Sequence, residues 1–134
     1  MLLSEHLQRD YVDGSTTVRA LQEINFTIRE GEFVAIMGPS GSGKSTLLHI
    51  LSFLDRPSGG RYTFFGKDIN DLSDAELAHT RNHEMGFIFQ SFNLLSRSTV
   101  YHNVELPLLY SDVPHEKRRA HVEKAVAAVG LTDK

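Results

Sequence analysis

The sequence of 134 residues contains no cysteine, which excludes disulfide bonds, thiolate metal sites and a cysteine nucleophile. It also lacks any apolar run near the roughly 18 residues that a membrane-spanning helix needs. Glu5 and Asp10 interrupt the N-terminal stretch that would be apolar in a signal peptide. We therefore expect a cytosolic chain that does not insert into a membrane.

Positive charge is also scarce. The chain has 14 Lys and Arg against 17 Asp and Glu, a net charge of -3. The cationic cluster at 115–119 is short and contains an acid, so nucleic acid is not an expected partner. No internal repeat or low-complexity tract interrupts the chain, and its length favours a single domain.

Hydrophobic periodicity predicts four strands. Alternating apolar residues at 24–28 indicate a strand with one buried face. The segments 33–37 and 85–90 are almost continuously apolar, as expected of strands covered on both faces of a parallel sheet. The segment 61–66 reads as a further strand that ends at a glycine.

Helix signals alternate with these strands. Apolar residues over 47–54 are too dense for one helical stripe, so this helix should be buried around most of its circumference and end near Asp55. Three further helices are predicted: about ten residues from the capping box of Ser73 and Glu76, one from about Thr99 to before Pro107, and one from Pro114 to Gly130. The order indicates an α/β fold behind an antiparallel β segment.

The stretch GPSGSGKST, residues 38–46, fits the pattern G-x-x-x-x-G-K-[ST] between a predicted strand and a predicted helix. Glycines let the backbone wrap closely with its N–H groups pointing inward, and the helix adds its positive dipole end. The loop is therefore predicted to hold the phosphates of a nucleotide. The residues expected to contact ATP here are Gly38, Ser40, Gly41, Ser42, Gly43, Lys44, Ser45 and Thr46.

Three side chains have distinct expected roles in this loop. Lys44 would reach the β- and γ-phosphates and act in catalysis, the Ser45 hydroxyl would ligate Mg²⁺, and Thr46 would donate to the α- or β-phosphate. A phosphate loop does not specify a reaction, because kinases, GTPases and transport ATPases share it.

The flanking sequence resembles the nucleotide-binding subunit of ATP-binding cassette (ABC) transporters. The matching stretches are VRALQEINFTIREGEFVAIMGPSGSGKSTLLHIL, PSGGRYTFFGKDI, GFIFQSFNLL and TVYHNVELPLL. LLHILSFLDRPSGG and NVELPLLYSDVP are most similar to the lipoprotein-releasing and macrolide-export group. The resemblance implies a P-loop NTPase (RecA-like) core with an N-terminal antiparallel β subdomain, incomplete at the C-terminus.

The resemblance assigns two further site residues. Tyr11 occupies the place of the aromatic residue that stacks on adenine, where a packed sheet-edge tyrosine is the alternative. Gln90 occupies the glutamine loop, where its amide oxygen would approach Mg²⁺ and the attacking water and so act in catalysis. The segment 91–98 would face the membrane partner.

The family also implies partners and a location. In the complete protein, ATP hydrolysis would power transport by a transmembrane permease, with two copies of the cassette dimerising at the cytoplasmic face of the inner membrane. We find no signature sequence, Walker B aspartate with catalytic glutamate, or switch histidine within 1–134. We therefore expect an N-terminal portion of the nucleotide-binding domain that does not turn over ATP by itself.

Two alternatives stay open. The chain could be a nucleotide-binding module without turnover, or an inert remnant. A P-loop nucleotide kinase is less favoured, because 37 residues precede the loop and no arginine-rich lid is visible.

The seven histidines show no spacing typical of metal ligands, and we expect them at the surface or in the core.

Overall fold

The computed structural model describes residues 1–132. The chain forms two compact units, whereas its length predicted a single domain. The first unit is Met1–Arg81 and the second begins at Asn82. The boundary falls inside a helix, α2 (Asp74–Glu84).

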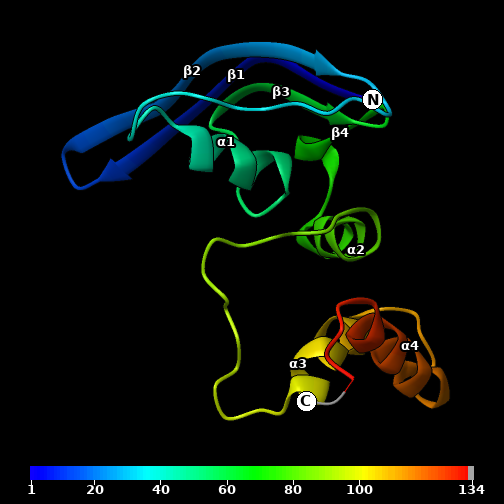
Figure 1. Cartoon of the computed structure of the whole chain (residues 1–134). Coiled ribbons are helices and arrows are strands. Elements are labelled where there is room, and N and C mark those ends of the chain that lie inside the picture. Colours follow the sequence, from blue (N-terminus) through cyan, green and yellow to red (C-terminus); the bar gives the residue numbers. More distant parts are fainter. Residues whose placement is uncertain (133–134) are drawn as a thin grey trace. The chain divides into compact units, whose positions relative to one another are not determined.

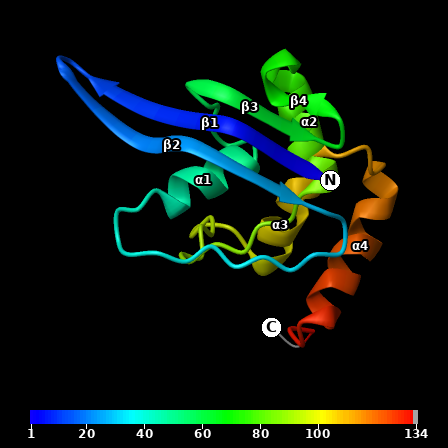
Figure 2. The same cartoon turned by 90° about the horizontal axis from the view of Figure 1, so that it is seen from above.

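The first unit contains an antiparallel sheet of four strands in the order β2-β1-β3-β4 (Figure 2). Its strands are β1 (Leu2–Asp13), β2 (Thr16–Ile28), β3 (Gly59–Phe64) and β4 (Lys67–Asp68). In β2 the alternate residues Ile24, Phe26 and Ile28 are half-buried while their neighbours are exposed. The predicted strand with one buried face, and the antiparallel segment around it, are confirmed.

Helix α1 (Lys44–Leu51) lies along one face of this sheet (Figure 1). Aromatic packing joins the two layers, because the Phe53 ring lies 5.9 Å from that of Tyr62 and 5.1 Å from that of Phe64. The buried apolar residues of the first unit are Leu7, Leu21, Ile50, Phe53, Tyr62, Ile69 and Leu77. The core therefore lies between the sheet and the helices on this face.

The prediction for α1 is wrong in its end and in its burial. The helix ends at Leu51, before the expected Asp55, because the Ser52 hydroxyl donates to the Leu48 carbonyl and Phe53 adopts a left-handed φ of 58°. Leu48 is 53% exposed and only Ile50 in the helix is buried. The described residues of the first unit cover one side of α1, which explains the exposed leucine.

A buried tyrosine hydroxyl bonds the C-terminal end of α1 to the sheet. The Tyr62 hydroxyl donates to the Leu51 carbonyl at 3.0 Å, and burial raises the pKa of this phenol. We expect Tyr62→Phe to lower the free energy of unfolding by about 1–2 kcal/mol, because the carbonyl loses its partner. Urea denaturation should show this loss, whereas Tyr110→Phe, at a side chain that is 76% exposed, should leave the midpoint unchanged.

The predicted capping box forms at the start of α2. The Ser73 hydroxyl accepts from the Glu76 amide at 3.3 Å, and the Glu76 carboxylate accepts from the Ser73 amide at 2.8 Å. A short 3₁₀ helix, η1 (Ile69–Asp71), precedes α2. The eleven residues of α2 agree with the expected length of about ten.

This capping box predicts an acid-dependent loss of stability. The Ser73 side-chain hydrogen bond, followed by the Ser73 amide, holds the pKa of Glu76 below its ordinary value of 4.5. A lowered folded-state pKa means that the stabilisation is present above the unfolded-state pKa and is lost as pH falls through the folded-state pKa. Denaturation of the parent and of Glu76→Gln should therefore differ at pH 7 and converge as the pH falls below about 4.

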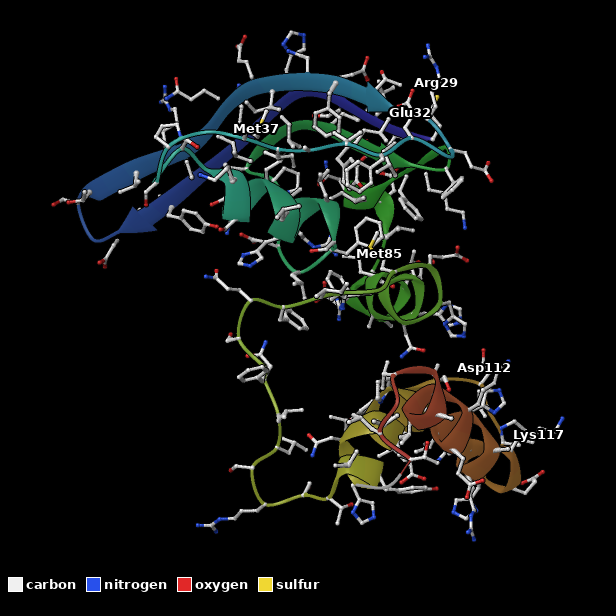
Figure 3. All side chains as sticks on the ribbon, in the orientation of Figure 1. Arg29, Glu32, Met37, Met85, Asp112 and Lys117 are labelled. Atoms are coloured by element: carbon white, nitrogen blue, oxygen red, sulfur yellow. The ribbon has the colours of Figure 1, made fainter. Side chains whose placement is uncertain are left out.

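Two predicted strands do not form among residues 1–132. The segments 33–37 and 85–89 have no regular secondary structure, and Met37, labelled in Figure 3, is 88% exposed. A strand is stabilised by hydrogen bonds to a neighbour, and the described sheet pairs neither segment. The apolar sequence is therefore present without the partner strands that a buried parallel sheet requires.

The second unit is helical. It contains α3 (Val100–Glu105), a 3₁₀ helix η2 (Leu106–Tyr110) and α4 (His115–Ala128). Thr99 caps α3 by accepting from the His102 amide, and Gly130 ends α4 with a φ of 70°. The Gly130 and Leu131 amides donate to carbonyls of the last helical turn, a Schellman motif. Both predicted helices are confirmed.

Within residues 1–132, the helices are all too short or too polar to cross a lipid bilayer.

Candidate functional site

Two glycines with left-handed backbone conformations determine the course of the loop at residues 38–46. Gly41 has a φ of 79° and Gly43 a φ of 84°, and the Ser42 amide closes a turn on the Pro39 carbonyl at 3.3 Å. A Cβ on Gly43 would lie 2.5 Å from the Ala20 carbonyl oxygen of β2. The glycine at this position is therefore needed both for its conformation and for close packing on the sheet.

The loop runs directly into the N-terminus of α1. Gly43 is the N-cap residue and offers no side chain to the helix, and the first backbone bond joins the Leu47 amide to the Gly43 carbonyl at 2.8 Å. The amides of Lys44, Ser45 and Thr46 precede this bond, so they have no acceptor within the helix. Their donors and the helix dipole favour an anion at this end of α1.

The Lys44 ammonium folds back over the loop. Its Nζ donates to the carbonyl oxygens of Gly38 at 2.9 Å and Pro39 at 2.6 Å, and to the Ser42 hydroxyl at 3.4 Å. An ammonium has three N–H donors, so these contacts use all of them. A phosphate that binds here must replace at least one of these partners.

Two hydroxyls stand at the start of α1. Ser45 is exposed, and Thr46 is half-buried. Ser40 and Ser42 are exposed in the preceding loop. The structure thus brings every predicted loop residue to one end of α1, and the donor set of amides, ammonium and hydroxyls fits a polyphosphate with Mg²⁺.

Tyr11 lies on β1, where it pairs with Val18 of β2. Its hydroxyl donates to Asp55 Oδ2 at 3.0 Å, and the Arg9 guanidinium carbon lies 4.5 Å from the centre of its ring. The side chain is 39% exposed. The ring is held by these contacts and still presents surface to solvent.

Gln90 belongs to the second unit, whereas the glycine loop belongs to the first. Gln90 is exposed in the irregular segment that follows two stacked rings, Phe87 and Phe89, whose centroids are 5.8 Å apart. The role of Gln90 at Mg²⁺ stays a prediction.

Sequence reasoning missed the residues around Tyr11. Arg9 Nη2 lies 2.8 Å from Asp55 Oδ1, so one carboxylate holds both Arg9 and Tyr11. Alternation along β1 would have placed Arg9 and Tyr11 on one face. No local signal connects them to Asp55, which is 44 residues beyond Tyr11.

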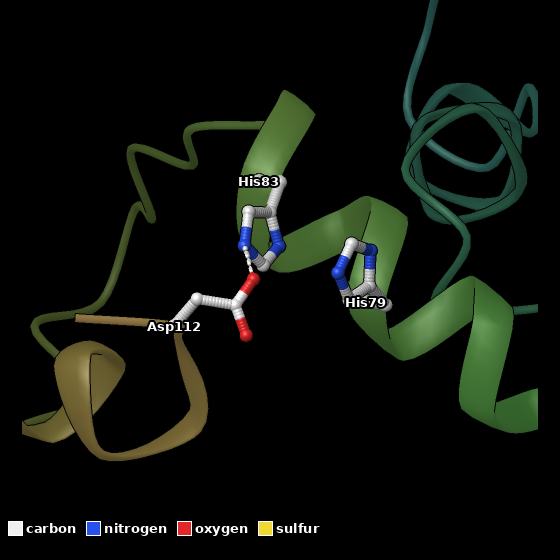
Figure 4. A group of neighbouring side chains, drawn as sticks. All are labelled: His79, His83 and Asp112. Atoms are coloured by element: carbon white, nitrogen blue, oxygen red, sulfur yellow. Dashed lines mark hydrogen bonds and ion pairs between the residues drawn. The ribbon is translucent and has the colours of Figure 1, made fainter. Parts of the chain in front are cut away.

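One histidine has an acidic neighbour that the sequence did not reveal. His83 Nε2 lies 3.1 Å from Asp112 Oδ2 within the second unit (Figure 4). Both residues are exposed, as expected of surface histidines. Because 29 residues separate the pair, spacing along the chain did not indicate it.

The sequence of this chain is similar to those of known proteins. Residues 21–134 match the sequence profile of the family described as "ABC transporter". YknY of Bacillus subtilis, described as an uncharacterized ABC transporter ATP-binding protein, is 44% identical over 100% of this chain and 58% of its own length. MacB of Bdellovibrio bacteriovorus, a macrolide export ATP-binding/permease protein, is 49% identical over 96% of this chain and 19% of its own.

A solved structure shares the fold. It is a dimeric, post-hydrolysis state of the ATP-binding cassette MJ0796 bound to ADP and Pi, with a TM-score of 0.83 and 41% identity over 95% of this chain and 56% of that chain. This likeness confirms the expected α/β P-loop fold with its N-terminal antiparallel subdomain. The chain spans a little over half the length of YknY and of this solved chain.

Proposed function

Because this chain belongs to the ABC transporter family, we propose that residues 38–46 bind the phosphates of MgATP. The observation that carries the proposal is the N-terminal end of α1. There, amides without a helical acceptor and the Lys44 ammonium lie in one loop. This donor set matches the negative charge of a polyphosphate.

Each loop group has a proposed part in binding. The amides of Ser40, Gly41, Ser42 and Gly43 line the backbone cradle around the β-phosphate. Lys44 exchanges its loop carbonyls for β- and γ-phosphate oxygens, the Ser45 hydroxyl ligates Mg²⁺, and Thr46 donates to the α- or β-phosphate. Mg²⁺, when bound, neutralises charge that develops on the transferred phosphate.

Two residues outside the loop each have a proposed role of their own. Tyr11 stacks on adenine through the exposed part of its ring. Gln90 orients water and Mg²⁺ through its amide, which accepts at oxygen and donates at nitrogen. Residues 1–134 are proposed to be the N-terminal portion of the nucleotide-binding domain.

Turnover and transport are proposed for the complete protein. Its ATP hydrolysis would drive a transmembrane permease, with two cassettes dimerising at the cytoplasmic face of the inner membrane. Two features of the relatives support this: MacB is named an ATP-binding/permease protein, and the MJ0796 cassette is dimeric. A binding module without turnover is the second candidate, because residues 1–134 contain no catalytic glutamate at a Walker B strand.

Calorimetric titration of the full chain with MgATP tests the binding proposal. We expect micromolar affinity with no phosphate release by this chain, and turnover only by a longer protein that carries the remaining family motifs. Absence of binding at millimolar MgATP would contradict the proposal and favour an inert remnant. Transfer of phosphate from MgATP to a nucleoside monophosphate would instead identify a nucleotide kinase.

A further inference from the structure

We propose that Asp55 is a positioning residue for Tyr11 and thereby sets how strongly the site distinguishes ATP from a bare polyphosphate. This inference rests on the proposed function, in which Tyr11 meets the adenine ring. Asp55 would not touch the nucleotide. It would act by holding the tyrosine ring in the orientation that a base stacks on.

The contacts of the Asp55 carboxylate support this role. One oxygen accepts from the Tyr11 hydroxyl at 3.0 Å, and the other lies 2.8 Å from Arg9 Nη2. The side chains of Asp55 and Arg9 are 24% and 23% exposed, so water screens this pair less than a surface pair. A single carboxylate therefore fixes both the tip of the tyrosine and the cation above its ring.

Arg9 covers the Tyr11 ring from one side. The guanidinium carbon is 4.5 Å from the ring centre, within the range of a cation–π contact. Arg9 and Tyr11 are two positions apart on β1, which places them on the same face of the strand. With one side of the ring occupied, the exposed remainder of the ring is the surface that a planar base can use.

The segment that carries Asp55 is itself fastened to β1. The Ser58 amide donates to the Gln8 carbonyl at 2.8 Å, and the Asp10 amide donates to the Ser58 hydroxyl at 3.1 Å. Residues 55–58 follow directly after the turn that ends α1. These two hydrogen bonds join the segment that follows α1 to the strand that carries Tyr11, so the phosphate loop and Tyr11 are connected within the first unit.

Fixing the ring before binding should strengthen base recognition. A side chain that is already ordered loses less conformational entropy when the base stacks on it. The gain applies only to ligands that have a base. Asp55 should therefore affect the affinity for MgATP without affecting the affinity for magnesium tripolyphosphate, which meets the loop alone.

The test is calorimetric titration of the full chain with both ligands. We expect Asp55→Ala to weaken MgATP binding by about threefold to tenfold while tripolyphosphate affinity stays within twofold. Asp55→Asn should recover part of the loss, because its amide oxygen still accepts from the Tyr11 hydroxyl. The matched control Asp71→Ala, at an exposed carboxylate of η1, should change neither affinity.

A double-mutant cycle separates positioning from a general structural role. In a Tyr11→Phe background, which lacks the hydroxyl but keeps the ring next to Arg9, adding Asp55→Ala should weaken MgATP binding less than it does in the parent. Equal weakening of both ligands, no change in either, or full additivity in the cycle would each overturn the proposal. If Asp55→Ala does not fold, Tyr11→Phe removes the same hydrogen bond and allows the same comparison of MgATP with tripolyphosphate. Failure of the parent chain to bind MgATP would contradict the proposed function itself, a result distinct from these.

Discussion

Replacing Lys44 with alanine is expected to weaken MgATP binding by the full chain roughly a hundredfold, because a charge-assisted hydrogen bond to phosphate contributes about 1.5–3 kcal/mol. The ammonium already lies at the mouth of the loop, bonded to the Gly38 and Pro39 carbonyls. Alanine removes the positive charge and keeps the helix, since it is the best helix former. Calorimetric titration measures the loss.

The control for this variant is Lys67→Ala, which removes the same charge from an exposed site on β4. We expect its MgATP affinity to stay within twofold of the parent. Circular dichroism should show that both variants retain the secondary structure of the parent. A Lys44→Ala chain that binds MgATP as tightly as the Lys67→Ala chain would contradict the proposed role of the loop.

The second large effect is expected from Gly43→Ala. The substitution places a Cβ 2.5 Å from the Ala20 carbonyl oxygen and 2.9 Å from Leu21 Cδ2, at a φ of 84°. Left-handed backbone costs an alanine about 1–2 kcal/mol, and forcing an atom into packed surroundings costs about 1–3 kcal/mol more. Urea denaturation should therefore show a loss of about 2–5 kcal/mol, accompanied by weaker MgATP binding.

Gly31→Ala is the matched control for this clash. Gly31 has a φ of 81°, and a Cβ there meets no atom within 4 Å. It should therefore lose only the left-handed penalty of about 1–2 kcal/mol and should leave MgATP affinity unchanged. If Gly31→Ala and Gly43→Ala are equally stable, close packing of the loop on β2 is not the reason for the glycine.

Local signals in the sequence were sufficient for much of the fold. The capping box at Ser73 and the Thr99 cap each place a helix start, and Gly130 places the end of α4. These features depend on residues three or four positions apart, and their hydrogen bonds form within one turn. Interpretation from the chain alone is strongest where cause and effect are this close.

The expected strands at 33–37 and 85–90 show the limit of such signals. The apolar content of these segments predicted strands that are covered on both faces of a sheet. A strand forms, however, only when it pairs with another strand. Within residues 1–132 neither segment has one. The sequence pattern indicates a burial preference, and pairing is a property of the whole sheet.

The candidate site divides in the same way. The loop at 38–46 was predictable, because its motif, its flanking elements and its chemistry are contiguous in the chain. The contacts of Asp55 with Tyr11 and Arg9 were not predictable. Asp55 is 44 positions beyond Tyr11 in the chain, and only the folded sheet and α1 bring the two residues together.

Backbone amide chemical shifts of the full chain, recorded with and without saturating MgATP, test the central claim most directly. If the loop holds the polyphosphate, the amides of residues 41–46 should move most, and Lys44→Ala should greatly reduce these shifts at the same ligand concentration. Unchanged loop amides at saturation, with the largest shifts elsewhere in the chain, would contradict the account.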